Sequence, residues 1–216
     1  VIIPPLRIRD NLELKPGDYQ VLLKGVQVGQ GSLMVGHQLA MDPGNVSSSV
    51  PGIPTKEPAF GLDALWIQSR YKDEATYAGY TVVDLSTVIA THLTELIRQN
   101  AYELLGRQEV QALLDSFKQV APKVVEDLIP NLLSLGAVLK VLKGLLKEGV
   151  PIRDLRTILE TLADNAMVQK DPQVLTETVR AALARVITRK LVGPDGQLTL
   201  LTLDRQIEET IAGGLI

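Results

Sequence analysis

The spacing of the apolar residues changes at Asp84, and this change limits the folds open to the chain. Before Asp84, short apolar or alternating runs are bounded by glycine and proline, a pattern typical of β-strands. After Asp84, apolar residues fall three and four positions apart, which places them along one face of an α-helix. The sequence therefore predicts an α+β protein in which a β-rich part precedes a largely helical part.

The β-rich part contains several expected strands separated by turn residues. A stretch over 44–58 that is rich in Gly, Ser and Pro is expected to cross between two strands as a loop. The expected turns are Gly17-Asp18, Gly29-Gln30-Gly31 and Pro43-Gly44. The expected strands cover residues 6–9, 19–23, 39–41, 64–68 and 80–83.

The helical part begins with a long helix that we expect to be capped by Asp84 or Ser86 and to end at Gly106. Asp171-Pro172 is another start signal, because the aspartate can accept hydrogen bonds from exposed amides and proline has no amide to lose in a first turn. After a turn at 193–196, a strand over 198–203 and a helix from Asp204 are expected to begin a further α/β unit. The remaining helices are expected over 108–120, 123–129, 134–148, 153–166 and 172–191.

The charge and the cysteine content exclude several classes of protein. Twenty-two basic and 25 acidic residues leave a net charge of −3, so we expect no overall field that gathers nucleic acid or anionic lipid. The absence of cysteine excludes disulfides, thiolate catalysis and cysteine-ligated metals. The longest apolar stretch, 128–146, is interrupted by Pro130, Asn131 and two lysines and falls short of a membrane-spanning helix. The start at Val1 lacks the features of a signal peptide, and we expect the chain to be a part of a longer protein.

Asp84, Ser86 and His92 are the residue types of a hydrolytic triad, but their spacing does not favour one. They occupy nine residues at one strand-to-helix junction, and Ser86 and His92 fall on nearly opposite sides of the helix. His37 and His92 lack a second ligand at a recognisable spacing, and His92 is expected to be a histidine on the flank of the helix. We therefore expect no enzymatic activity, no catalytic residue, no metal and no other cofactor.

Basic residues on the later helices leave a nucleic-acid-binding helical module as a minor alternative. The residues at 148–151 join two helices with the outline of a helix-turn-helix. Glu160, Asp164 and Glu177 interleave with the basic residues, so a nucleic-acid partner is not expected. The basic residues are Lys140, Lys143, Lys147, Arg180, Arg185, Arg189 and Lys190.

The run from Pro54 to Gly61 places an aromatic residue on a stiff connection. Proline holds its own backbone in one narrow range and pushes the preceding residue into an extended conformation. Pro58 and Gly61 flank Phe60, so they place it on a loop instead of inside a strand. We interpret this loop as part of a docking surface.

Six co-linear segments closely resemble the cytoplasmic domain of the FHIPEP family, the FlhA-type flagellar export-gate proteins. The similarity runs in order from about residue 6 to about residue 190. The segments are LRIRDN from Leu6, PTKEPAFGL from Pro54, GYTVVD from Gly79, STVIATHL from Ser86, ELLGRQE from Glu103 and IRDLRTILETL from Ile152.

The resemblance implies a bacterial inner-membrane protein whose transmembrane half precedes Val1. Its cytoplasmic half is implied to form a homo-oligomeric ring beneath the flagellar type III export channel, with export chaperones, their substrates and other export-apparatus proteins as partners. The resemblance further implies a small α/β first domain with an inserted β-rich subdomain, an all-helical domain and a truncated α/β piece. On this chain these fall at 1–35 with 85–105, at 36–84, at 106–190 and at 191–216.

The chaperone site that the resemblance implies is a hydrophobic dimple between the first two domains. Its acid falls on Glu57, its aromatic residue on Phe60, its threonine on Thr91, and its strand-edge apolar residues on Leu39, Met41 and Pro43. We hypothesise that a pocket around Phe60 buries an aromatic or aliphatic anchor, which Glu57 and Thr91 orient through hydrogen bonds. A virulence injectisome export gate of the same family is the alternative, although the segments 54–62 and 80–84 resemble the flagellar branch.

Overall fold

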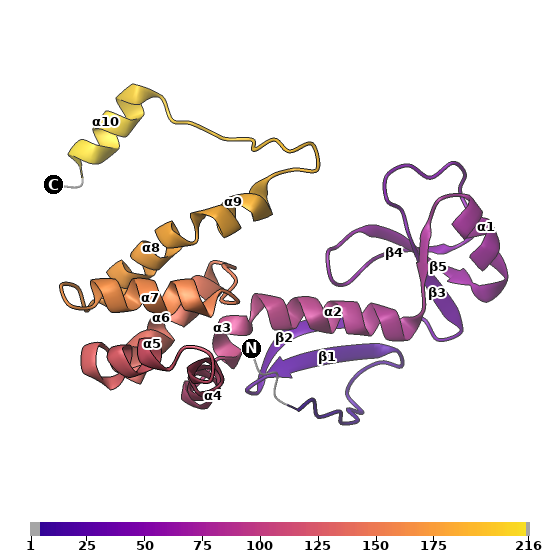
Figure 1. Ribbon diagram of the computed structural model, residues 1–216. Coiled ribbons are helices and arrows are strands. Elements are labelled where there is room, and N and C mark those ends of the chain that lie inside the picture. Colours follow the sequence, from indigo (N-terminus) through magenta and orange to yellow (C-terminus); the bar gives the residue numbers. More distant parts are fainter. Residues whose placement is uncertain (1–4, 215–216) are drawn as a thin grey trace. The chain divides into compact units, whose positions relative to one another are not determined.

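The computed structural model describes residues 5–214, and the chain divides into two compact units (Figure 1). One unit ends at Glu109 and the other begins at Val110. Among the described residues all the strands belong to the first unit, and the second unit is helical. This mixture of helix and sheet confirms the predicted α+β class, while the finer division into a first domain and an inserted subdomain stays a prediction.

A two-stranded antiparallel hairpin forms one part of the first unit. β1 (Asp18–Leu23) pairs with β2 (Val26–Ser32), and Leu23 lies opposite Val26 at the closed end. Lys24 and Gly25, which connect the strands, both have positive φ, as the tight turns that match the twist of a hairpin require. The hairpin places Tyr19 of β1 opposite Gly31 of β2.

The glycines of β2 correct one prediction. Gly29-Gln30-Gly31, expected to be a turn, lies inside the strand. A β-carbon on Gly29 would overlap the side chain of Leu96 on helix α2 (Leu85–Gln99), and one on Gly31 would lie 2.6 Å from the hydroxyl oxygen of Tyr19. These glycines therefore allow a helix and a tyrosine to approach the strand closely, and they do not reverse the chain.

A four-stranded antiparallel sheet in the order β4-β5-β3-β6 forms the other part of the first unit. Leu39 and Trp66 belong to an apolar cluster that includes Val88 of α2, whereas Ala40 and Ile67 belong to a second cluster. Because successive strand residues point to opposite faces, each face of the sheet has its own core. The strands are β3 (His37–Met41), β4 (Ile53–Lys56), β5 (Asp63–Gln68) and β6 (Thr81–Val83).

Three features of the first unit differ from the sequence analysis. β4 lies inside the stretch 44–58 expected to be a loop, and its Pro54 is tolerated because β4 is an edge strand. The short elements η1 (Ser69–Tyr71) and α1 (Lys72–Tyr77) are too brief to produce a helical period, so they were not expected. The segment 6–9 forms no strand, since it has no neighbouring strand to pair with and its Ile8 is 88% exposed.

Asp84 is the residue that caps α2. Its carboxylate accepts hydrogen bonds from the backbone amide of Thr87 at 2.7 Å and from the hydroxyl of Ser86 at 2.8 Å, and these bonds hold the pKa of Asp84 below its usual value. The helix then stops at Gln99, and α3 (Ala101–Leu104) follows after a break at Asn100. A single helix reaching Gly106 was expected, so the break corrects that prediction.

The second unit is built around three helices that bury one apolar face each. The fully buried residues of α6, α7 and α8 include Leu142, Leu159 and Leu175. Gly144 on α6 allows Thr176 of α8 to approach, with only 3.0 Å between a β-carbon on the glycine and that threonine. The helices are α4 (Arg107–Lys118), α5 (Pro122–Glu126), η2 (Asp127–Leu132), α6 (Leu135–Lys147), α7 (Leu155–Asn165), α8 (Pro172–Ala182), α9 (Ala184–Leu191) and α10 (Arg205–Gly213).

In the second unit, two predicted helix starts are confirmed, while one predicted helix and one predicted strand are wrong. Asp171 and Asp204 each accept a hydrogen bond from the backbone amide two residues on, as expected for helix starts. The helix expected over 172–191 breaks at Leu183 into α8 and α9. The residues 198–203, expected to form a strand, form none, and neither sheet in the described part of the chain includes them.

No single helix within residues 5–214 is long and apolar enough to cross a membrane. The helices over 122–132 and 135–147 together satisfy the length and composition of a span, but they are bent by 110° with respect to each other.

Gly17 offers a test of the hairpin. Its φ is +93°, and a β-carbon there would overlap the carbonyl oxygen of Leu33, whereas Gly36, with φ of +81°, has open space around it. We expect Gly36→Ala to lower the free energy of unfolding by about 1 kcal/mol through backbone strain alone. Gly17→Ala should lower it by at least about 2 kcal/mol, since the steric overlap adds to the strain. Equal urea midpoints for the two variants would contradict this account.

Candidate functional site

The loop that contains Phe60 is closed by hydrogen bonds of the Glu57 backbone. The amide of Glu57 donates to the carbonyl oxygen of Leu62 at 2.8 Å, and the carbonyl oxygen of Glu57 accepts from the amide of Gly61 at 2.9 Å. Gly61 has φ of +71°, which lets the chain turn back into β5. We call residues 57–62 the Phe60 loop.

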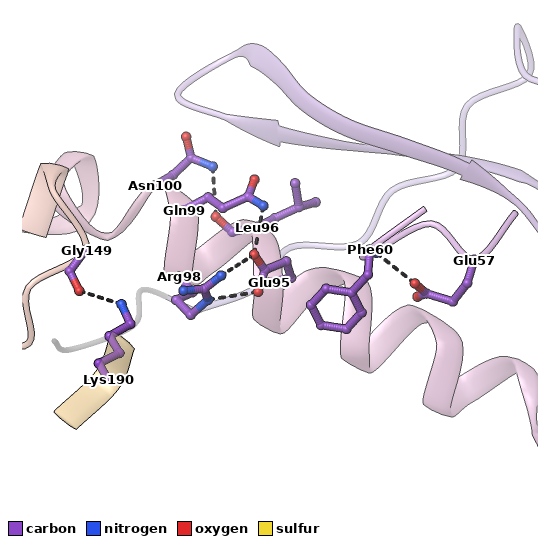
Figure 2. A network of polar contacts seen from close by, with 9 residues as sticks. All are labelled: Glu57, Phe60, Glu95, Leu96, Arg98, Gln99, Asn100, Gly149 and Lys190. Carbon is purple, nitrogen blue, oxygen red and sulfur yellow. Dashed lines mark hydrogen bonds and ion pairs between the residues drawn. The ribbon is translucent and has the colours of Figure 1, made fainter. Parts of the chain in front are cut away.

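The carboxylate of Glu57 fixes the same loop from inside. One oxygen accepts a hydrogen bond from the amide of Ala59 at 2.9 Å. The other accepts one from the amide of Phe60 at 2.7 Å (Figure 2). Only 3% of Glu57 is exposed. A buried carboxylate is tolerated when donors satisfy its oxygens, and here the donors are the amides of its own loop. Glu57 therefore shapes the loop that presents Phe60, and its predicted role in orienting an anchor stays a prediction.

A hollow of about 310 Å³ lies between Phe60 and one face of α2. The Phe60 side chain is 61% exposed, although most phenylalanines are buried. Figure 2 shows its ring beside α2, on which Glu95 also lies. The volume is at the lower end of the range of ligand pockets, which is adequate for one side chain of a partner. The hollow is lined by Phe60, Thr87, Ala90, Thr91, Thr94 and Glu95.

The charges around this hollow are paired locally. The carboxylate of Glu95 accepts hydrogen bonds from Arg98 at 2.6 and 2.8 Å and from Gln99 at 2.8 Å, and these bonds lower the pKa of Glu95 (Figure 2). Lys56 and Asp63, which flank the Phe60 loop in the sequence, form an ion pair at 2.6 Å. The hollow thus combines an exposed ring, small side chains and cancelled charge, a surface suited to an apolar side chain.

The residues predicted for partner binding do not all lie together. Phe60 and Thr91 line the hollow, and Glu57 lies in the loop that presents Phe60. Leu39 is fully buried beside Trp66, so its side chain is not available to a partner. Met41 packs against the same cluster as Leu39, and neither it nor the exposed Pro43 lines the hollow.

The sequence analysis missed four residues that line the hollow. Thr87, Thr94 and Glu95 lie three or four positions from Thr91, and Ala90 lies three positions from Thr87 and four from Thr94. They therefore share one face of α2 with it. The same helical spacing predicted the apolar face of this helix. Counting three and four positions from Thr91 in both directions would have predicted this face too.

A tyrosine-histidine pair lies on the inner side of α2, with His92 buried and Tyr19 half-buried. The hydroxyl of Tyr19 and Nδ1 of His92 are 2.7 Å apart, and their rings meet edge to face at 5.7 Å. His92 is 5% exposed, so it is a core residue and not the helix-flank histidine that the sequence analysis expected. Burial lowers the pKa of His92, while the charge of Glu57 opposes that shift. Burial, assisted by the charge of Glu57, raises the pKa of Tyr19 to about 12.

A larger hollow, of about 480 Å³, lies between the hairpin and the C-terminal half of α2. Its lining is mostly apolar and includes Val21, Leu23, Leu93 and Leu104. None of the residues predicted for partner binding lines it.

Comparison with known proteins gives consistent results. The model of the FHIPEP family matches residues 1–215. The flagellar biosynthesis protein FlhA of Escherichia coli (strain K12) is 49% identical over 212 residues, which are 98% of this chain and 31% of that protein. The protein of the same name from Bacillus subtilis (strain 168) is 46% identical over 215 residues, which are 100% of this chain and 32% of that protein. The chain thus spans about a third of the length of these relatives.

Solved structures with the same fold come from related secretion proteins. The Chlamydia pneumoniae CdsV protein is 31% identical, with a TM-score of 0.81 over 94% of this chain and 60% of that chain. Nonameric EPEC SctV-C is 25% identical, with a TM-score of 0.61 over 92% of this chain and 68% of that chain.

The shifted pKa values of Tyr19 and His92 predict how stability depends on pH. Between the ordinary pKa of 6.5 and the lowered pKa of His92, the unfolded chain binds more protons than the folded chain. The free energy of unfolding should therefore fall as the pH drops below 6.5. It should fall again as the pH rises from 10 to about 12, where only the folded chain keeps the proton of Tyr19.

Urea denaturation at stepped pH values measures both effects. His92→Asn should flatten the acid limb of the profile and Tyr19→Phe the alkaline limb, each relative to the unaltered chain. Profiles that keep both slopes in both variants would show that other groups are responsible.

Proposed function

Because the chain belongs to the FHIPEP family, we propose that it is a docking part of the flagellar type III export gate. In this proposal an export chaperone that carries its substrate binds at the cytoplasmic face of the bacterial inner membrane. An apolar side chain of the chaperone enters the hollow between Phe60 and α2, and docking there helps to order the delivery of substrates.

The exposed ring of Phe60 is the observation on which the proposal depends. A large aromatic side chain that stays in water does not gain the favourable free energy of burial, which is about 1.5 to 3 kcal/mol for a side chain of this kind. Four hydrogen bonds of Glu57 fix the backbone of the loop that carries the ring. An exposed aromatic residue on a fixed backbone beside a hollow has the properties of a binding hot spot.

The side chains on this face of α2 favour an apolar anchor over a charged one. Small side chains at Ala90 and Thr91 leave room beside Phe60, and the carboxylate of Glu95 is already paired with Arg98. Burying an apolar group here leaves no charge without a partner, and the threonine hydroxyls can still exchange hydrogen bonds with a polar edge of the anchor.

The whole protein is proposed to form a homo-oligomeric ring. The related SctV-C is described as nonameric, and CdsV has been solved in complex with the CdsO protein. By analogy, several copies of the chain would present the same hollow, together with surfaces for other export-apparatus proteins.

A virulence injectisome gate is the second candidate, because CdsV has the same fold at a TM-score of 0.81. The identity of 49% to a flagellar protein against 31% to CdsV favours the flagellar role. Tighter binding of an injectisome chaperone than of a flagellar chaperone would reverse this order.

Phe60→Ala tests the anchor. We expect it to weaken binding of a purified flagellar chaperone in complex with its substrate by about 2 kcal/mol, or roughly thirtyfold in Kd, by isothermal titration calorimetry. Unfolding should be nearly unchanged, since the ring contributes little to the core. The matched control is Tyr77→Ala, which removes a 91% exposed aromatic residue from α1. Equal losses in the two variants would argue against a specific site.

Ala90→Arg tests the hollow itself. Arginine is a good helix former, so α2 should remain intact while the long side chain fills the space beside Phe60. The Kd for the same complex should rise at least tenfold, whereas Ala90→Ser, which leaves the hollow open, should change it by less than about twofold. A chaperone that binds the arginine variant as tightly as the unaltered chain does not use this hollow.

A further inference from the structure

We infer that Arg98 determines the specificity of the hollow beside Phe60: by binding the carboxylate of Glu95, it keeps the hollow selective for an uncharged anchor. The inference deepens the proposed function and rests on it for the identity of the partner. The selectivity itself is a property of the folded chain, so it can be measured without a partner. Arg98 does not line the hollow, and its effect is exerted through Glu95, which does.

Glu95 is the single ionisable residue among those that line the hollow in the described part of the chain. The other lining residues are one phenylalanine, three threonines and one alanine. Only 9% of the Glu95 side chain is exposed. A carboxylate with so little access to water needs hydrogen-bond donors from the protein. These donors therefore decide whether the hollow carries an uncompensated negative charge.

Arg98 supplies two of the three hydrogen bonds that Glu95 accepts. Its Nε donates to Oε2 at 2.8 Å and its Nη2 donates to Oε1 at 2.6 Å, so the guanidinium holds both oxygens in a fork. Nε2 of Gln99 adds a bond to Oε1 at 2.8 Å. Within residues 5–214, Oε2 accepts no other hydrogen bond and depends on Arg98 alone. The pairing lowers the pKa of Glu95 and raises the pKa of Arg98, so both groups stay ionised.

The two donors also act on the direction of the Glu95 side chain. Figure 2 shows the side chain of Arg98 and the ring of Phe60 on opposite sides of Glu95. Side chains of a helix lean toward its N-terminus, so a glutamate without these donors would extend over the preceding turn. That turn carries Thr91, which lines the hollow. Loss of Arg98 would therefore both free the carboxylate and let it enter the space of the anchor.

Two roles of Arg98 make different predictions. Its side chain is 61% exposed, so it could contact a partner directly, and its replacement should disturb the core little. If it acts by direct contact, losing it should weaken binding whichever residue stands at position 95. If it acts through Glu95, the loss should disappear once position 95 is also made neutral.

NMR titration with two small probes tests the inference on the chain alone. n-Butanol and n-butylammonium carry the same alkyl group, which fits a hollow of about 310 Å³. In the unaltered chain, n-butanol should shift the amide signals of Thr91 and Thr94 roughly threefold more than n-butylammonium at equal concentration, because a paired carboxylate offers a cation little. In Arg98→Met, the shifts caused by n-butylammonium should rise roughly threefold, since the carboxylate is free to attract it. In the double variant Arg98→Met/Glu95→Gln they should fall back.

The matched control is Arg205→Met on α10. It breaks another arginine-glutamate pair, in which Nε of Arg205 donates to Oε1 of Glu209 at 2.9 Å, and neither residue lines the hollow. The control should leave the response to both probes unchanged. The same preference between the probes in all variants, or no shift of either amide by n-butanol, would overturn the inference.

Titration of the chaperone complex then connects this selectivity to docking. Arg98→Met should raise the Kd about tenfold, because an apolar anchor would be buried beside an unpaired carboxylate. The double variant with Glu95→Gln should return the Kd to within about twofold of that of the unaltered chain. A loss that persists in the double variant would show that Arg98 contacts the partner itself, and it would overturn the inference. A complex that does not bind even the unaltered chain would refute the proposed function, while the two probes would still decide the selectivity of the hollow.

Discussion

The buried carboxylate of Glu57 is the interaction on which the docking face depends. It satisfies two amides of its own loop, so the loop needs no contact with a partner to hold its shape. A site whose geometry exists before binding avoids part of the entropy cost of ordering a loop when a partner arrives. The glutamate at this position braces the loop from inside, and in the proposed function the exposed aromatic ring next to it makes the contact.

Helix α2 connects the elements of the first unit. Its buried face reaches the hairpin at Gly29 through Leu96 and the four-stranded sheet at Leu39 through Val88, while an adjoining face lines the hollow. One rigid helix therefore fixes both the core behind the site and the surface in front of it. Sites on helices hold their side chains more precisely than sites made only of loops, and here the helix supplies the floor for a loop residue.

Local chemistry was predictable from the sequence, and contacts between distant segments were not. Caps at Asp84, Asp171 and Asp204 and the exposure of Phe60 follow from neighbouring residues, which the sequence displays directly. His92 is paired with Tyr19, 73 residues away, and Gly29 lies in a strand paired with β1, where its missing side chain makes room for Leu96. Leu39 was assigned to the site by resemblance, but the period of two in β3 turns it into the core beside Trp66.

The pairing of Glu95 with Arg98 has a kinetic consequence. A surface whose charges cancel within a few ångströms produces little field at a distance, so it cannot steer a partner during diffusion. Encounters at such a surface proceed at unassisted rates, and one small anchor is released readily. In the proposed function, a docking site that receives several chaperone complexes in turn would benefit from short residence times. Several copies of such a weak site in one assembly would retain a complex through repeated rebinding, and not through high affinity at any single hollow.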